Sequence, residues 1–317
     1  MIRSVAMGAA VAALLGLGVC VGFAAYAQAP PAPAPVPASA PAVSPASDPA
    51  NWRKVDPENL LVLTIKREEV LIELRPDFAP GHVAQVKKIT RDTNYDNLPF
   101  HRVIDQFMAQ GGETYAVYQV YPRYPLLKGE FTFERDPLKQ KVTWVGKTAE
   151  GDNLGYLDGF VVQGQPDEAA SILASAKAKT WALHCPGIAS MARTNDPNSA
   201  DTQFFLMRQS RTGTPDVGGL DQAYTIWGRA LTGLETIRAI KAGPEDTDGR
   251  LPPGQADKMN KAQVAADLKD NKRPTVYVQR TDGPLFLASV AAIPKPTDPN
   301  SACALPPVNV VVERPTP

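Results

Sequence analysis

The feature that most constrains this chain is a pair of segments about eighty residues apart, Phe100–Gly112 (FHRVIDQFMAQGG) and Gly187–Phe205 (GIASMARTNDPNSADTQFF). Each segment places an arginine or a glutamine beside aromatic and thioether side chains. Such a combination suits an apolar slot whose edge carries polar hydrogen-bond donors. We therefore expect a fold that brings the two segments together to form one slot.

The elements before the first segment follow the order strand, strand, helix, strand. Two β-rich runs, Leu60–Ile65 and Val70–Leu74, flank the charged stretch Lys66–Glu69, which predicts a hairpin. Pro80 then begins a helix with apolar residues at helical spacing, and this helix ends around Asn94. A strand leading into the first segment completes the order.

Further elements are predicted toward the C-terminus. Thr232–Lys241 has an apolar stripe at helical spacing and is followed by the helix-breaking pair Gly243-Pro244, which indicates a second helix. Thr275–Gln279 is a strand candidate. The chain shows no internal repeat.

Together with a third stretch, Gly218–Gly228 (GGLDQAYTIWG), the two segments resemble the cyclophilin family of peptidyl-prolyl cis/trans isomerases. Many bacterial members share the Ala192-Arg193-Thr194 form, so the resemblance indicates a secreted or periplasmic bacterial subgroup. It implies a mainly β fold, an eight-stranded antiparallel barrel capped by two helices. It also implies a peptidylprolyl isomerase that needs no cofactor and acts on proline-containing polypeptides.

The resemblance also implies the site. Its catalytic residues would be Arg102, Phe107 and Gln110, and its substrate-binding residues Met108, Met191, Ala192, Arg193, Gln203, Phe205, Leu220 and Tyr224. The chain departs from the family's common pattern at three of its positions. Arg193 stands where most members have asparagine, Tyr224 where eukaryotic members have histidine, and Gly219 where those members have the tryptophan that holds the drug cyclosporin.

The chemistry fits these residue types. An X-Pro bond isomerises over tens of seconds because its partial double bond imposes a barrier of about 20 kcal/mol. Lowering this barrier requires no nucleophile, only a pocket for the ring and a donor whose hydrogen bonds strengthen as the amide twists. Arg102 is the candidate donor because its guanidinium is always charged. His101 points to the opposite face of the strand and is expected in the core.

About seventy residues, 113–186, separate the two segments, more than a compact cyclophilin uses there, and we treat them as an insertion. Gln165-Pro166-Asp167-Glu168, followed by Ala169–Ala178, predicts a short helix within it. The insertion keeps a second function open, a cyclophilin-fold chaperone or binding module with little isomerase activity. The expected domains are a linker at 28–55, the isomerase domain at 56–280 and a Pro-rich C-terminal tail at 281–317.

The N-terminus predicts export. Arg3 precedes an apolar run that ends in Ala25-Tyr26-Ala27, the small-x-small pattern of a signal peptide comprising residues 1–27. We expect a periplasmic or secreted protein that begins at Gln28, followed by a Pro/Ala-rich disordered spacer. Two alternatives stay open: an uncleaved membrane anchor, and lipidation of Cys20.

The net charge limits the classes of partner that are expected. Thirty-three basic and 33 acidic side chains leave no net charge, so nucleic acid is not an expected partner, and a membrane is one only if the N-terminus stays uncleaved.

Removal of the signal peptide leaves two cysteines, Cys185 and Cys303, which either form a disulfide or stay unpaired. The three histidines, His82, His101 and His184, have no metal-ligand spacing, so no metal site is expected. We expect a monomer.

Overall fold

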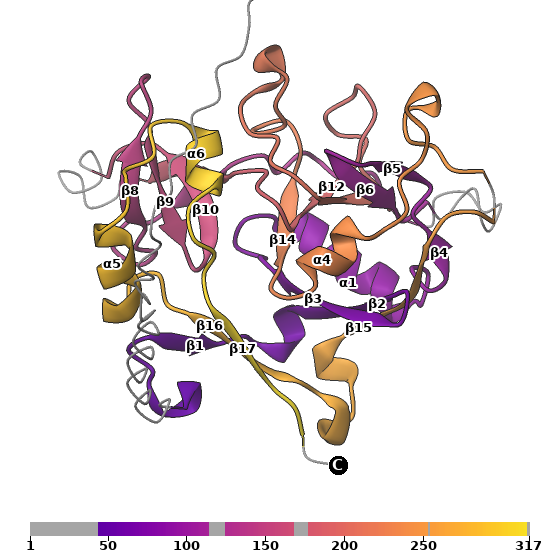
Figure 1. Ribbon diagram of the computed structural model, residues 1–317, viewed down its shortest axis with the longest axis horizontal. Coiled ribbons are helices and arrows are strands. Elements are labelled where there is room, and N and C mark those ends of the chain that lie inside the picture. Colours follow the sequence, from indigo (N-terminus) through magenta and orange to yellow (C-terminus); the bar gives the residue numbers. More distant parts are fainter. Residues whose placement is uncertain (1–43, 114–123, 168–176, 253, 316–317) are drawn as a thin grey trace, which may run out of the picture. The chain divides into compact units, whose positions relative to one another are not determined.

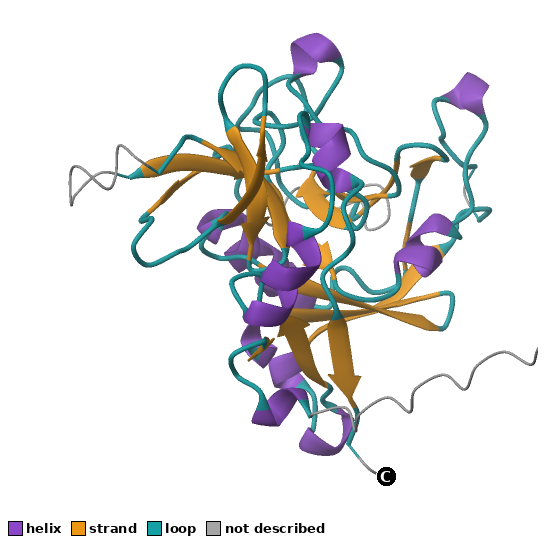
Figure 2. Ribbon diagram, turned by 60° about the vertical axis from the view of Figure 1, so that its left-hand side comes forward, coloured by secondary structure: helices purple, strands orange, loops and turns teal. Residues whose placement is uncertain are grey.

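The structure, a computed structural model, describes residues 44–113, 124–167, 177–252 and 254–315. In this part of the chain most regular structure is β-strand, arranged in three antiparallel sheets (Figures 1 and 2). The prediction of a mainly β fold is confirmed. The expected signal peptide, residues 1–27, and residues 28–43 of the expected linker lie outside the described residues.

The predicted hairpin is confirmed. It consists of β2 (Leu60–Ile65) and β3 (Glu68–Leu74), and every residue of β2 pairs with one of β3. The turn is only Lys66 and Arg67, whose φ angles are 53° and 75°. Two consecutive residues with positive φ give the tight turn whose twist matches that of paired strands. Glu68 and Glu69, expected in the turn, therefore belong to β3.

The largest sheet has the strand order β4-β15-β2-β3-β14-β12-β13-β6-β5. Its other strands are β4 (Leu98–Pro99), β5 (Arg102–Ile104), β6 (Met108–Gly111), β12 (Ile188–Met191), β13 (Phe204–Met207), β14 (Ile226–Ala230) and β15 (Lys258–Val264). Only Phe100 and His101 separate the two outermost strands, β4 and β5, so the sheet curls until its ends lie close together. Nine strands replace the predicted eight because one strand is interrupted there: β4 pairs with β15, whereas Val103 donates to the carbonyl of Gly249.

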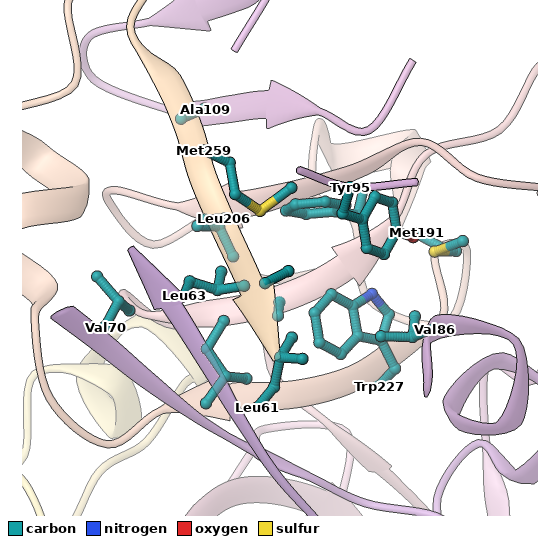
Figure 3. Close-up of a cluster of buried hydrophobic side chains, with 14 of the residues drawn as sticks. Leu61, Leu63, Val70, Val86, Tyr95, Ala109, Met191, Leu206, Trp227 and Met259 are labelled. Atoms are coloured by element: carbon teal, nitrogen blue, oxygen red, sulfur yellow. The ribbon is translucent and has the colours of Figure 1, made fainter. Parts of the chain in front are cut away.

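Helix α1 (Pro80–Arg91) is the predicted first helix, and its apolar stripe of Val83, Val86 and Ile89 is buried against the curled sheet. Tyr95 and Trp227 fill the same core, part of which Figure 3 shows in close-up. The second predicted helix is α4 (Leu234–Arg238), shorter than expected at both ends. It begins two residues late because Gly233 takes a left-handed backbone conformation immediately before it. No helix among the described residues is long and apolar enough to span a membrane.

The insertion forms a sheet of its own, which the sequence interpretation missed. Its strands lie in the order β7-β11-β10-β9-β8 and are β7 (Phe133–Arg135), β8 (Thr143–Lys147), β9 (Asn153–Leu157), β10 (Phe160–Gly164) and β11 (Ala178–Ala182). The predicted helix at 165–178 is not supported at its two ends: residues 165–167 are not helical, and Ala178 begins β11. Its middle, residues 168–176, lies outside the described residues.

The third sheet joins both ends of the folded part. It consists of β1 (Trp52–Lys54), β16 (Thr275–Gln279) and β17 (Val310–Glu313), with β16 in the middle, where a strand was predicted. Regular structure therefore extends beyond the expected boundaries at residues 56 and 280. The Pro-rich composition hid a run of β-branched valines, which favour strands.

The segment between β16 and β17 also contains two helices, α5 (Pro284–Ala291) and α6 (Pro299–Cys303). At the end of α6, Cys303 forms a disulfide with Cys185, with the two Cα atoms 5.2 Å apart. The elements of the described residues also include six single-turn 3₁₀ helices: η1 (Pro45–Ser47), η2 (Pro57–Asn59), η3 (Pro215–Val217), η4 (Glu245–Thr247), η5 (Ala265–Asp267) and η6 (Asp270–Lys272).

Candidate active site

A cavity of about 300 Å³ opens where β5, β6 and β13 meet the loops that follow β12 and β13. Its lining combines aromatic and thioether side chains with guanidinium and amide groups: Arg102, Phe107, Met108, Gln110, Ala192, Arg193, Phe205, Arg211, Gly218, Leu220 and Tyr224. The sheet register explains why distant segments meet here. β13 pairs with β6 so that Phe205 lies opposite Gln110, and β6 pairs with β5 so that Gln110 lies opposite Arg102.

Arg102 is held by groups on two sides. Its Nε and Nη2 donate to the carboxylate of Asp248 at 3.0 and 3.1 Å, and its Nη1 donates to Gln110 Oε1 at 3.2 Å. The hydrogen bond from Arg102 holds the pKa of Asp248 below its usual value. One hydrogen on each terminal guanidinium nitrogen has no partner among the described residues, so two donors are free to bind a ligand.

Gln110 belongs to a chain of side-chain amides. Its Nε2 donates to Gln203 Oε1 at 2.8 Å, and Gln203 Nε2 in turn donates to Glu113. These bonds fix which end of each amide faces which neighbour, because an oxygen accepts and a nitrogen donates at each step. The Gln110 oxygen therefore faces Arg102.

The floor of the cavity rests on a buried polar network. Phe205 stacks on the His184 ring, with centroids 6.2 Å apart. His184 Nδ1 lies 2.8 Å from Asp221 Oδ1 and its Nε2 lies 3.2 Å from Ser190 Oγ. All three polar residues are buried, and hydrogen bonds satisfy buried polar groups at low cost. The network therefore fixes the ring on which Phe205 lies.

One wall is formed by Tyr224, whose ring contacts Phe205 edge to face with centroids 5.8 Å apart. The Arg193 guanidinium lies over the Tyr224 ring, 4.5 Å from its centroid. Gly219 contributes no side chain, and a Cβ placed there would lie 2.0 Å from the carbonyl oxygen of Gly213. No side chain fits at this position without movement of the backbone.

The structure brings most of the expected site residues together. Nine of the eleven line the cavity: Arg102, Phe107, Met108, Gln110, Ala192, Arg193, Phe205, Leu220 and Tyr224. Gln203 lies in an adjoining cavity with Thr194 and Asp201. Met191 is 1 % exposed and belongs to the barrel core, where Figure 3 shows it, so its expected contact with substrate is not supported.

Three residues of the site were not predicted from the sequence: Arg211 and Gly218, which line the cavity, and Asp248, which pairs with Arg102. All three lie in loops without hydrophobic periodicity. Asp248 could have been found only if the position of Arg102 on β5, next to this loop, had been known.

The described lining contains no thiol, imidazole or aliphatic hydroxyl group. Among the described residues, no group of three or more His, Cys, Asp and Glu side chains is arranged to hold a metal ion. The cavity instead offers an apolar slot for a small ring beside fixed donors. Such a site can bind a backbone and stabilise one of its conformations.

Comparison with known proteins agrees with this geometry. Residues 60–264 match the family model described as cyclophilin type peptidyl-prolyl cis-trans isomerase/CLD. A probable peptidyl-prolyl cis-trans isomerase of Brucella suis biovar 1 is 33 % identical over 214 residues, which cover 68 % of this chain and 86 % of the relative. A peptidyl-prolyl cis-trans isomerase of Streptomyces antibioticus, cyp18, is 28 % identical over 54 % of this chain and 76 % of the relative.

Among solved structures, cyclophilin AquaCyp293 from Hirschia baltica is similar, with a TM-score of 0.76 and 37 % sequence identity. The match covers 86 % of this chain and 98 % of that structure. The part of the chain that this match covers is longer than the span of residues 60–264. The likeness therefore extends into segments outside the span of the family model.

Proposed function

Because this chain belongs to the family of cyclophilin-type peptidyl-prolyl cis-trans isomerases, we propose that Arg102 stabilises the twisted amide of an X-Pro bond whose ring lies in the cavity. The observation that carries this proposal is the fixed guanidinium at the edge of the apolar slot. Asp248 and Gln110 hold it in place while two of its donors stay free.

The slot fits the ring. Apolar surface on several sides of the slot comes from Phe107, Met108, Phe205 and Leu220. Burying a pyrrolidine ring against this surface contributes binding free energy without any change in covalent bonds. The second hydrogen of the Gln110 amide is available to the peptide backbone. With the ring fixed, rotation about the X-Pro bond moves the preceding carbonyl past Arg102.

The free donors of Arg102 accelerate this rotation. In the planar amide the nitrogen lone pair is delocalised, but in the twisted amide it is localised and can accept a hydrogen bond. An interaction that exists only in the transition state lowers the barrier directly. Because the guanidinium is already oriented, little reorganisation is needed when the bond twists.

The cellular role follows from the N-terminus. We infer that residues 1–27 direct export and that the enzyme assists the folding of secreted or periplasmic proteins. Fractionation of cells expressing the full chain, with sequencing of the mature N-terminus, tests the first part. We expect the protein outside the cytoplasm with Gln28 as its first residue, and an intact Met1 in the cytoplasm would contradict this.

A refolding experiment tests the folding role and the alternative of a binding module together. Catalytic amounts of the protein from Gln28 onward should increase the rate constant of a proline-limited refolding phase, and Phe205→Ala should reduce the increase. A higher yield of refolded client with an unchanged rate constant would favour the chaperone. No described residue of the insertion lines the cavity.

A further inference from the structure

Two arginines at the cavity, Arg193 and Arg211, have no acidic partner among the described residues. Arg102, by contrast, forms an ion pair with Asp248. The described lining includes three arginines and neither aspartate nor glutamate. After Asp248 neutralises Arg102, the rim of the slot therefore carries an excess of two positive charges.

Arg193 is fixed in a conformation that leaves donors free. Its Nε donates to the carbonyl of Ala223 and its Nη1 to the carbonyl of Thr194, both at 2.8 Å. Its guanidinium also lies within 6 Å of the ring centroids of Tyr224 and Phe131. Neither hydrogen of Nη2 has an acceptor among the residues that the structure describes. A carboxylate that binds there would cost little side-chain entropy because the guanidinium is already ordered.

Arg211 occupies a different part of the rim. Its guanidinium lies over the Phe107 ring, 5.2 Å from the centroid. Its backbone is anchored on both sides, because its N–H donates to His184 and its carbonyl accepts from Leu220. The side chain itself is exposed, so its charge faces solvent and any peptide that enters the slot.

We propose that Arg193 and Arg211 make this site selective for prolyl bonds that have an acidic residue directly beside the proline. The preference deepens the proposed isomerase function and rests on it. A carboxylate in that position lies near a rim of excess positive charge, so both binding and the rate at low substrate concentration increase.

The preference is local. The adjoining cavity, which a longer peptide would reach, is lined by Asp201 as well as by Arg193, and Glu113 contacts Gln203 beside it. These carboxylates oppose a substrate acid there. We therefore expect the effect at the two positions flanking proline and not at a position three residues away.

The test uses pairs of acetylated, amidated peptides that differ only by glutamate or glutamine. In one pair the variable residue directly precedes proline, in a second it directly follows, and in a third it lies three residues before. Exchange NMR measures kcat/KM for each peptide without a coupling protease. The readout is the glutamate-to-glutamine ratio within each pair, so that basal activity cancels.

We expect this ratio to be about two- to tenfold for at least one flanking pair at low salt, the range of one or two exposed ion pairs. It should approach one at about 1 M salt, where screening acts over roughly 3 Å. The third pair should give a ratio near one.

Variants assign the effect to the two arginines. The double variant Arg193→Gln/Arg211→Gln should bring every ratio close to one. Lys272→Gln removes a positive charge from an exposed lysine in η6 that does not line the cavity, and it should leave the ratios unchanged.

The outcomes separate the two proposals. If the glutamine peptides are not accelerated at all, the proposed isomerase site is wrong. If they are accelerated but every flanking ratio is near one at low salt, or the double variant keeps the ratios of the wild type, the acidic preference is wrong.

Discussion

At the scale of single residues, the site depends on how one guanidinium is oriented. Asp248 has a left-handed backbone conformation, φ 53°, which aspartate adopts more readily than most residues. This conformation turns its carboxylate toward Nε and Nη2 of Arg102. Asp248 is thus a positioning residue, which acts on the substrate only through Arg102.

Asp248→Asn should lower kcat about three- to tenfold, equivalent to about 1 kcal/mol, and change KM little. Asparagine tolerates the same backbone angle but cannot accept from the guanidinium with two charged oxygens. Steady-state kinetics and a thermal unfolding curve check this. An unchanged kcat at unchanged stability would show that Asp248 does not position Arg102.

Gly219 sets the expected response to cyclosporin. The resemblance implies that an indole at this position holds the drug, and here no side chain fits beside the Gly213 and Thr212 carbonyls. We expect weak binding, with a dissociation constant well above the submicromolar range, measured by titration. Submicromolar binding would contradict this expectation.

At the scale of elements, the sequence predicted the helices and strands that local composition and residue spacing determine. The β2–β3 hairpin was found from two β-rich runs around a charged stretch, the start of α1 from Pro80 followed by apolar residues at helical spacing, and β16 as a strand candidate. The insertion sheet had a signal too. Asp158-Gly159 between two apolar runs is a strong hairpin signal, and both residues have positive φ. The loop positions of Arg211 and Asp248 had no such signal, because tertiary contacts alone determine them.

The N-terminus of α1 shows a contact that no local pattern contains. Its N-cap residue, Ala79, has no side-chain acceptor, and Glu130 supplies one from the insertion. The Glu130 carboxylate accepts from the amides of Gly81 and His82 at 3.0 and 3.1 Å and from His82 Nδ1 at 2.7 Å. The first turn of α1 is thus tied to a segment about fifty residues away.

Glu130→Gln should therefore reduce the free energy of unfolding by about 1–2 kcal/mol at neutral pH, as the loss of a capping group does. Burial by itself raises the pKa of Glu130, but the hydrogen bonds from His82 and the two amides outweigh it and lower the pKa. A lowered pKa means that this stability is present above the unfolded pKa of about 4.5 and is lost as the pH falls through the folded value. Denaturant unfolding of both proteins across pH 3–7 should show the difference shrinking at acid pH, and a constant difference would refute the assignment.

At the scale of the whole molecule, charged side chains join the three sheets of the described residues. Arg53 on β1 donates to Glu73 on β3 at 2.5 and 2.8 Å and to the carbonyl of Asp158 between β9 and β10 at 2.6 Å. Arg75 also pairs with Asp158, at 3.1 Å. Glu73 is buried, so removing Arg53 would leave a buried carboxylate without this ion pair. The added sheets are therefore integral to the barrel and not loosely attached.

The disulfide adds a covalent link between the C-terminal segment and the loop beneath the cavity. Closing a loop across 118 residues restricts the unfolded chain, with a stabilisation of about 2–5 kcal/mol. Cys303→Ser should lower the denaturation midpoint to the value of reduced wild type, and reductant should not lower it further. Equal midpoints for oxidised wild type and the variant would show that the link contributes nothing.

The most direct test is the kcat/KM of the protein from Gln28 onward on a proline peptide, wild type against Arg102→Ala. We expect a loss of about 10²–10³-fold, as when one preorganised donor to a transition state is removed, with the fold retained. Arg314→Ala is the matched control, because Arg314 also pairs with a carboxylate, that of Glu69, and does not line the cavity. A folded Arg102→Ala variant with the kcat/KM of the wild type would contradict the mechanism.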